Sequence, residues 1–179
     1  DIISVGEIRD GETGAIAIRS AITGHLVLST LHTNDAVSAI DRLADIGVEP
    51  YLIASALRGV ISQRLVRKVC PHCKKAYKPD AGELELLGLP EDADVQFYRG
   101  EGCEECYHTG YRGRRAVFEI LTMSSELRRL VTEGAGYDTL LASARKTDFV
   151  TMRENCRELV LRGETSAEEA ARAINSTVE

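Results

Sequence analysis

The chain has 179 residues, enough to bury a core of its own, since a chain of this size buries roughly 70% of its extended surface. With 44% hydrophobic and 28% charged residues, it has the composition of an ordinary globular protein, and no apolar run approaches the roughly 18 residues of a membrane span. A net charge of −6, with three Phe, six Tyr and no Trp, argues against general nucleic-acid binding.

The start of the chain indicates a piece of a longer protein. Asp1 stands directly before the apolar run Ile2–Val5, and neither an initiator Met nor a charged leader precedes that run. We therefore expect upstream sequence, and with it part of any active site, to lie outside this chain.

Strand and helix patterns alternate over the first part of the chain. A β-branched run at residues 2–5 and an apolar run at residues 25–31 predict two buried strands, with a helix over residues 12–22 between them. The first helix is expected to be capped by Asp10 and to end at Gly24. The next helix is expected to be capped by Thr33 or Asn34 and to end at Gly47. Strands that are apolar on both faces are typical of a parallel sheet covered by helices, so the sequence predicts an α/β fold.

Further helices and strands are predicted after residue 47, and the tail of the chain is predicted to be helical. A helix is expected at residues 50–58, and strands at residues 63–69 and 115–121. Three later helices are expected to begin at capping positions, namely Ser124 or Ser125, Asp138, and Ser166 with Glu169 as a capping box. One helix face is predicted from apolar residues at helical spacing, namely Phe149, Met152, Cys156, Leu159 and Val160, which makes Cys156 a buried small hydrophobe.

The charge pattern changes where periodicity fades, between residues 70 and 110. Residues 58–75 carry six basic and no acidic side chains, whereas residues 80–105 carry nine acidic and one basic. This asymmetry indicates two surfaces that face each other or a neighbouring molecule, or two separately solvated faces.

Four of the five cysteines form two C-x2-C pairs. Cys70 and Cys73 make up the first pair and Cys103 and Cys106 the second, with 29 residues between the pairs. Two such knuckles supply the four thiolates of a structural zinc site, which leaves no open position for a catalytic water. The sequence therefore predicts a zinc ion that stabilises this segment without taking part in chemistry.

Other interpretations of the cysteines stay open. A disulfide framework is disfavoured in a chain without a secretion signal, and a redox dithiol would have no need of a matching second pair. The thiols could also be unrelated, and His72 or His108 could replace a ligand. The cations expected to offset the thiolate charge are Arg67, Lys68, Lys74 and Lys75.

An acidic residue, Glu7, follows the first predicted strand. Ile2–Val5 followed by Gly6 and Glu7 has the layout of a Walker B element, in which an acid lies at the strand edge where Mg²⁺ and the attacking water bind. His32 follows the second strand and would reach the same edge if the strands are parallel. His25 stands at the start of that strand, where a purely structural histidine is the alternative.

These motifs, in collinear order over residues 1–122, resemble the secretion ATPase family that powers type II secretion and type IV pilus assembly (GspE/PilB-like). The resembling segments are residues 6–10, 23–34, 63–66 and 102–114. The resemblance implies a RecA-like P-loop ATPase that forms a homo-hexamer on the cytoplasmic side of the inner membrane. There it would hydrolyse ATP with Mg²⁺ and act on an inner-membrane platform protein.

The resemblance also implies roles for particular residues. Glu7 would orient the hydrolytic water, and His25 and His32 would be the two His-box histidines that contact the phosphate end of ATP. The nucleotide-binding residues implied in this way are Gly6, Glu7, Arg9, Asp10, His25 and His32. The four cysteines resemble the zinc ligands of the assembly and secretion branch, whereas retraction ATPases lack them.

The sequence departs from the family pattern in three respects. It contains no G-x-x-x-x-G-K-[ST] phosphate loop. The family's Asp box and arginine fingers lie upstream of the Walker B element and are missing. Residues 151–156 match the family only loosely, with Asn155 and Cys156 where relatives often have Asp and Gly.

We therefore expect the C-terminal half of a RecA-like α/β ATPase core in residues 1–69 and 111–122. A four-cysteine zinc insert is expected at residues 70–110, and a helical C-terminal region at residues 123–179. The fragment alone should be inactive. The alternative is a zinc-stabilised protein-interaction module without ATPase activity, and a nucleic-acid-binding zinc ribbon is a weaker third interpretation.

Overall fold

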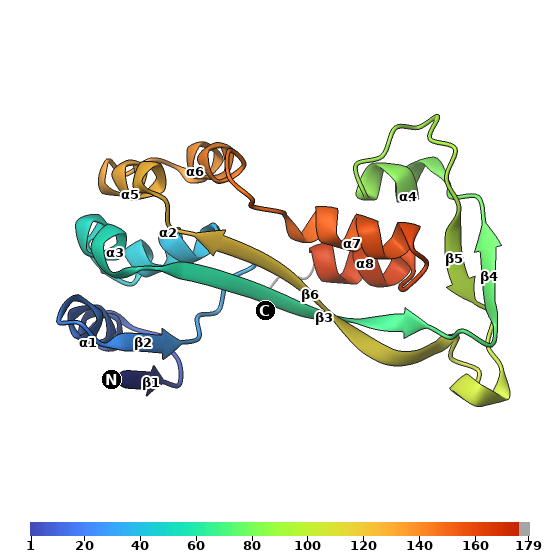
Figure 1. The fold of residues 1–179 in the computed structure, drawn as a ribbon, viewed down its shortest axis with the longest axis horizontal. Helices are drawn as coiled ribbons and strands as arrows, with labels where there is room; N and C mark the ends of the chain where they lie inside the picture. The colour runs from blue at the N-terminus through green and yellow to red at the C-terminus, as the bar shows by residue number, and fades with distance from the viewer. Residues whose placement is uncertain (176–179) are drawn as a thin grey trace. The chain divides into compact units, whose positions relative to one another are not determined.

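The computed structural model describes residues 1–175, which form a mixed arrangement of helices and strands (Figure 1). The chain divides into two compact units, each with its own hydrophobic core. Unit 1 consists of residues 1–62 and 120–149, and unit 2 of residues 63–119 and the segment that starts at Val150. The expectation of three functional segments, 1–69 with 111–122, 70–110 and 123–179, stays a prediction beside this structural division.

Unit 1 alternates strands and helices along the first part of the chain. Its complete elements are β1 (Ile2–Val5), α1 (Gly11–Ile22), β2 (Leu26–Ser29), α2 (Ser38–Asp45), α3 (Pro50–Ala56), α5 (Ser125–Thr132) and α6 (Tyr137–Ala144). β1 and β2 are parallel, with Ile2 opposite Leu26 and Val5 opposite Ser29. The predicted α/β start is confirmed, although β2 is shorter than expected at both ends.

The start of α2 differs from the prediction that Thr33 or Asn34 caps it. α2 begins at Ser38, because the Asp35 carboxylate accepts hydrogen bonds from the backbone N–H of Ser38 at 2.8 Å and from its hydroxyl at 2.6 Å. Such a side-chain bond to the backbone three residues on holds a turn ahead of the helix.

The core of unit 1 is formed by its helices together with Leu121 and Met123. Ile53, Leu127 and Leu140 have no exposed surface. Phe149 packs in this core as well, so its predicted place on one helix face with Cys156 is wrong. The reason is that the chain leaves unit 1 after Phe149, and α7 (Met152–Leu161) begins in unit 2.

Unit 2 contains the cysteine segment and the C-terminal helices. The long strands β3 (Gly59–Val69) and β6 (Tyr111–Thr122) pair, and each has residues in both units. β4 (Lys74–Tyr77) and β5 (Phe97–Gly100) are antiparallel. The remaining elements are α4 (Ala81–Leu86), the 3-10 turn η1 (Glu104–Cys106), α7 and α8 (Ala167–Asn175). Residues 70–110 thus hold short regular elements where the sequence shows little periodicity.

The capping box predicted at the start of α8 forms only in part. The Ser166 hydroxyl accepts the N–H of Glu169 at 3.3 Å. The Glu169 carboxylate instead accepts from Arg67 in β3, from its backbone N–H at 2.8 Å and from its guanidinium at 2.6 Å. Burial opposes ionisation of Glu169, but the donors of Arg67 outweigh this effect and lower the pKa of the carboxyl.

The core of unit 2 contains Cys156, which has no exposed surface and packs with Phe97 and Val160 among others. Burial raises the pKa of this thiol to about 11, as expected for a small hydrophobe. Among residues 1–175, no helix has the length and apolar character that crossing a membrane would require.

Truncation of Ile53 tests the core of unit 1. Ile53→Ala is expected to lower the free energy of unfolding by about 3 kcal/mol, because it removes fully buried methyl groups and leaves a cavity. Denaturant titration measures the change. Ile16→Ala is the matched control, since Ile16 in α1 is 58% exposed and its loss should cost less than about 0.5 kcal/mol. Equal effects of the two substitutions would contradict this assignment of the core.

Candidate nucleotide edge and metal centre

Glu7 and His32 lie together where the β1–β2 pair ends. Nε2 of His32 lies 2.7 Å from Oε1 of Glu7. Two further hydrogen bonds join the segments that follow β1 and β2. The Ile8 N–H donates to the Thr30 carbonyl at 3.0 Å, and the Thr30 hydroxyl donates to the Gly6 carbonyl at 2.8 Å. Parallel pairing therefore brings the acid and the imidazole to one edge of the sheet. Thr30, which the sequence analysis does not single out, helps to hold this edge.

Each oxygen of the Glu7 carboxylate has a nitrogen-bearing side chain beside it. Nε of Arg9 donates to Oε2 at 2.6 Å, while Oε1 is buried and makes no regular hydrogen bond within residues 1–175. The 2.7 Å approach of His32 becomes a hydrogen bond when Nε2 carries a proton. The Glu7 side chain is 20% exposed, against 77% for Arg9 and 67% for His32, so an incoming ligand can reach the two partners of the acid.

Asp10 and Gly6 have simpler surroundings. The Asp10 carboxylate caps α1 by accepting the Thr13 N–H at 2.8 Å, and the bonds from Thr13 lower its pKa. Gly6 is exposed, with no atom within 4 Å of the place where a Cβ would stand. The structure gives Asp10 the capping role expected of it, and nucleotide contacts of Gly6 and Asp10 stay predictions.

His25 lies at the opposite end of β2. Its Nδ1 lies 3.2 Å from the Ser20 carbonyl and 3.4 Å from the Thr23 hydroxyl, at the end of α1. The backbone N–H of His25 also donates to the Ser20 carbonyl at 3.2 Å. The structure therefore does not bring His25 to Glu7 and His32, and its predicted contact with a nucleotide rests on the family resemblance.

The four predicted cysteine ligands meet in unit 2. Their Sγ atoms all lie within 4.8 Å of one another, and this cluster includes neither His72 nor His108. The separations are 3.7 Å for Cys103–Cys106, 3.8 Å for Cys73–Cys106 and 4.0 Å for Cys70–Cys103. A tetrahedral zinc ion with Zn–S bonds of about 2.3 Å requires sulfur separations of about 3.8 Å, whereas a disulfide requires about 2.05 Å. The donor set thus fits zinc, and all four thiols are free.

Backbone N–H groups surround the sulfurs. Gly102 donates to Sγ of Cys73 at 3.3 Å, while Cys103 and Gly110 donate to Sγ of Cys106 at 3.2 and 3.3 Å. Burial opposes ionisation of Cys106, but these two donors and hydrogen bonds from the Cys103 and Cys73 thiols outweigh it and lower the pKa of the thiol to about 6, whereas burial raises the pKa of Cys73 and of Cys103. The local backbone therefore favours the thiolate form of Cys106, which is the form that binds metal.

The two knuckles meet at a pair of glycines. A Cβ on Gly100 would stand 2.0 Å from the carbonyl oxygen of Gly110, and Gly110 has a φ of +76°. The same carbonyl accepts the N–H of Cys70 at 2.9 Å. Only glycine permits this approach, which places the first ligand beside the second knuckle.

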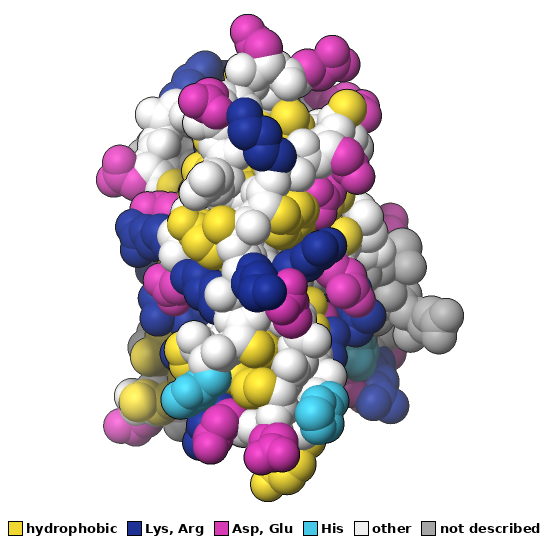
Figure 2. All heavy atoms as spheres, turned by 90° about the vertical axis from the view of Figure 1, so that its right-hand side faces the viewer, with side chains coloured by type: hydrophobic (Ala, Val, Ile, Leu, Met, Phe, Trp, Pro, Cys, Tyr) yellow, Lys and Arg dark blue, Asp and Glu magenta, His cyan; other side chains and the backbone are white. Residues whose placement is uncertain are grey.

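The charged segments around the knuckles face each other across β4 and β5. Lys75 pairs with Glu101 at 2.6 Å, and Nζ of Lys74 lies 4.2 Å from the centre of the Tyr98 ring. Figure 2 shows basic and acidic side chains interspersed on one face. Arg67 and Lys75 pair with carboxylates, and the N–H donors at the sulfurs belong to the backbone, so compensation of thiolate charge by the cations stays a prediction.

Comparison with known families and sequences gives consistent matches. The family described as type II/IV secretion system protein matches residues 1–172. Over 178 residues the chain is 51% identical to the type IV pilus assembly ATPase PilB of Thermus thermophilus, covering 97% of this chain and 20% of that protein. Over 172 residues it is 45% identical to type II secretion system protein E of Pseudomonas aeruginosa, covering 96% of this chain and 34% of that protein. The chain thus spans between a fifth and about a third of these relatives.

Solved structures share the fold. The pilus retraction motor PilT with bound ADP superposes with a TM-score of 0.66 at 27% identity, over 98% of this chain and 40% of that one. The ATPase DotB of Yersinia pseudotuberculosis superposes with a TM-score of 0.65 at 18% identity, over 97% of this chain and 36% of that one, and shows the fold alone.

Replacement of two ligands tests the metal centre. The double variant Cys70→Ser and Cys103→Ser is expected to lose the roughly one zinc ion per chain that elemental analysis should find, because each knuckle then offers one thiolate. Unit 2 should also unfold at a lower temperature, because metal binding and folding are coupled. Cys156→Ala is the control, since this buried cysteine lies outside the cluster and its loss should leave zinc content unchanged. Zinc-free wild-type chains of unchanged stability would contradict the assignment.

Proposed function

The chain belongs to the family of type II/IV secretion system proteins, and we propose that it is the C-terminal part of a RecA-like, homo-hexameric ATPase. The proposed reaction is Mg²⁺-dependent ATP hydrolysis coupled to type II protein secretion or type IV pilus assembly. The observation that carries the proposal is the approach of His32 to Glu7 within 2.7 Å, beyond the carboxyl ends of two parallel strands. Open α/β sheets bind their ligands at that edge.

The residues of this edge would act by position and charge. Bound ATP would supply the phosphoryl group, and bound Mg²⁺ would supply positive charge. Glu7 would orient the attacking water, and Arg9 holds the second oxygen of its carboxylate. The exposed imidazole of His32 could donate a hydrogen bond to Glu7 or to a phosphate oxygen, and protonation would add positive charge there.

The other parts of the proposal concern metal, location and partner. Zinc would occupy the four-cysteine cluster as a structural ion, since the sulfur spacing fits a closed tetrahedral site. By analogy with the secretion and pilus ATPases it resembles, the protein would act in the cytoplasm at the inner membrane, on a membrane-embedded platform protein. No contact with nucleic acid is proposed, in line with the net charge of −6.

A zinc-stabilised interaction module without ATPase activity is the second candidate. Such a module would bind a partner protein through the oppositely charged faces of residues 70–110, and Lys74 and Lys75 are basic residues of that segment. Both side chains have partners within unit 2, because Lys75 pairs with Glu101 and Lys74 lies over the ring of Tyr98. The ATPase proposal is therefore the better supported of the two.

Substitution in the full-length protein tests the nucleotide edge. Glu7→Gln is expected to lower kcat roughly 10²- to 10⁴-fold, because the amide cannot accept a proton from water. Phosphate release measures kcat, and zinc content should stay unchanged. Glu12→Gln is the control, an acid in the first turn of α1 that has no part in the proposed site. A variant of Glu7 with wild-type kcat would refute the assignment.

The 179-residue chain alone is expected to release phosphate from ATP at a negligible rate. The reason is that its sequence has no G-x-x-x-x-G-K-[ST] loop, whose backbone and lysine position the phosphates. The measurement is phosphate release with and without Mg²⁺. Robust release that requires Mg²⁺ and disappears in Glu7→Gln would overturn this expectation.

A further inference from the structure

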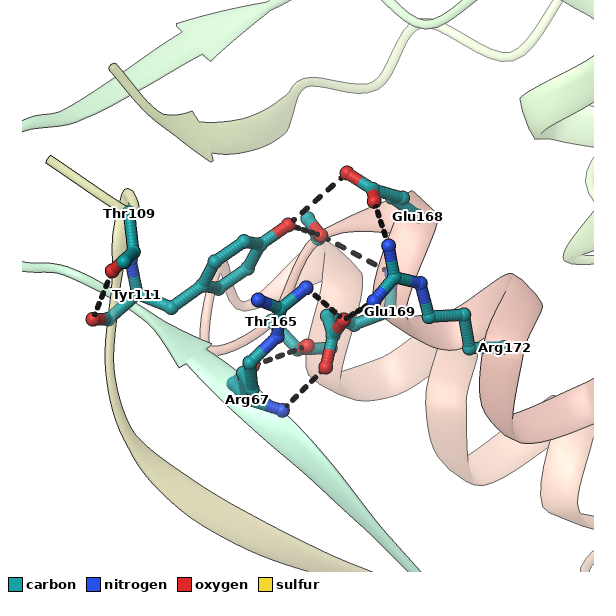
Figure 3. Close-up of polar contacts among 8 residues, drawn as sticks. Arg67, Thr109, Tyr111, Thr165, Glu168, Glu169 and Arg172 are labelled. Carbon is teal, nitrogen blue, oxygen red and sulfur yellow. Dashed lines mark hydrogen bonds and ion pairs between the residues drawn. The ribbon is translucent and has the colours of Figure 1, made fainter. Parts of the chain in front are cut away.

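A network of polar contacts links α8 to both cysteine knuckles within unit 2. Figure 3 shows the guanidinium of Arg67 against the ring of Tyr111 and directed at Glu169, and its centre lies 4.1 Å from the ring centroid. The Tyr111 hydroxyl lies 2.7 Å from that of Ser166, the residue before α8. From the sequence, Arg67 is expected to offset thiolate charge and Glu169 to form a capping box, whereas no role is expected for Tyr111.

On the side of the first knuckle, the network fixes the end of β3. Arg67 bonds to Glu169 through its backbone N–H and its guanidinium, and its carbonyl accepts the Thr165 hydroxyl at 2.8 Å. Two residues later, the N–H of Val69 donates to the Glu164 carbonyl at 3.0 Å. The next residue is the ligand Cys70. The turn before α8 and the first residues of α8 therefore hold the strand that presents this sulfur.

On the side of the second knuckle, the path runs through Tyr111. Its N–H donates to the Thr109 hydroxyl at 3.3 Å, and that hydroxyl donates to the carbonyl of the ligand Cys106 at 2.6 Å. Gly110, the neighbour of Tyr111, donates its N–H to Sγ of Cys106 at 3.3 Å and accepts the N–H of Cys70 at 2.9 Å. One network thus reaches the backbone of a ligand in each knuckle.

We propose that Arg67, Tyr111 and Glu169 are positioning residues of the metal centre, through which zinc binding and the docking of α8 strengthen each other. The proposal rests on the zinc assignment made above. Glu169 is suited to this role because its side chain is 6% exposed and joins α8 to β3. Partners that orient metal ligands commonly change metal affinity 10- to 100-fold when they are removed. Linkage then requires that the metal stabilise the docked helix by the same factor.

The test measures zinc affinity and stability together in the 179-residue chain. Glu169→Gln is expected to weaken zinc binding about tenfold in competition with a chromophoric chelator. It should also lower the melting temperature more in the zinc-loaded chain than in the chelator-treated chain. A purely structural role would lower both melting temperatures equally and leave the affinity unchanged.

Further variants make the result specific. Tyr111→Phe removes only the hydroxyl contacts with Ser166 and Glu168 and should weaken zinc binding less than Glu169→Gln, with little risk to folding. Glu158→Gln is the matched control, since Glu158 pairs with Arg162 on the exposed side of α7 and should leave zinc affinity unchanged. Removal of zinc from the wild type should also speed hydrogen exchange of the amides of α8, while those of α5 in unit 1 stay unchanged.

Different failures have different meanings. If the wild-type protein binds zinc, and Glu169→Gln and Glu158→Gln bind it with the same affinity, the positioning role is overturned and the zinc assignment stays intact. Unchanged exchange of α8 on zinc removal would overturn the coupling. A wild-type chain that binds no zinc would overturn the zinc assignment and the coupling with it.

Discussion

The parallel pairing of β1 with β2 is the constraint on which the candidate nucleotide edge depends. Register places Val5 opposite Ser29, so the residues that follow the two strands leave the sheet side by side. The bonds between Thr30 and Gly6 and between Ile8 and Thr30 carry this pairing past the strand ends. The acid and the imidazole then approach within 2.7 Å without any long loop having to fold around them. An antiparallel pair would have sent Glu7 and His32 to opposite edges.

The metal centre depends on backbone geometry of a different kind. Four sulfurs converge because the carbonyl of Gly110 lies where a side chain of Gly100 would stand, and because N–H groups of three residues point at the sulfurs. Gly110 donates to a sulfur and precedes Tyr111, and Cys70 follows the end of β3 that Arg67 joins to α8. A structural ion in this position can therefore influence a helix that contributes no ligand, which is the basis of the coupling proposed above.

The two centres lie in different units, each with its own core. The candidate nucleotide edge belongs to unit 1 and the cysteine cluster to unit 2, and within residues 1–175 the chain crosses between the units three times. The long strands β3 and β6 account for two of these crossings, and residues 149–150 for the third. Two relatives of this chain are named as a type IV pilus assembly ATPase and a type II secretion system protein. Both centres of this chain fall within the matched residues.

The sequence alone determined the features that depend on local periodicity and short spacing. These are the strand at residues 2–5, the carboxylate that follows it, the choice of the four cysteines that cluster and the burial of Cys156. Tertiary structure decided what depends on residues far apart in the chain. It placed Phe149 in the other core, set His25 against the end of α1, and paired Arg67 with Glu169 across 102 positions. The physical reason is that a side chain contacts the partner that folding brings near it, and the periodicity of the sequence does not indicate which distant residue that partner is.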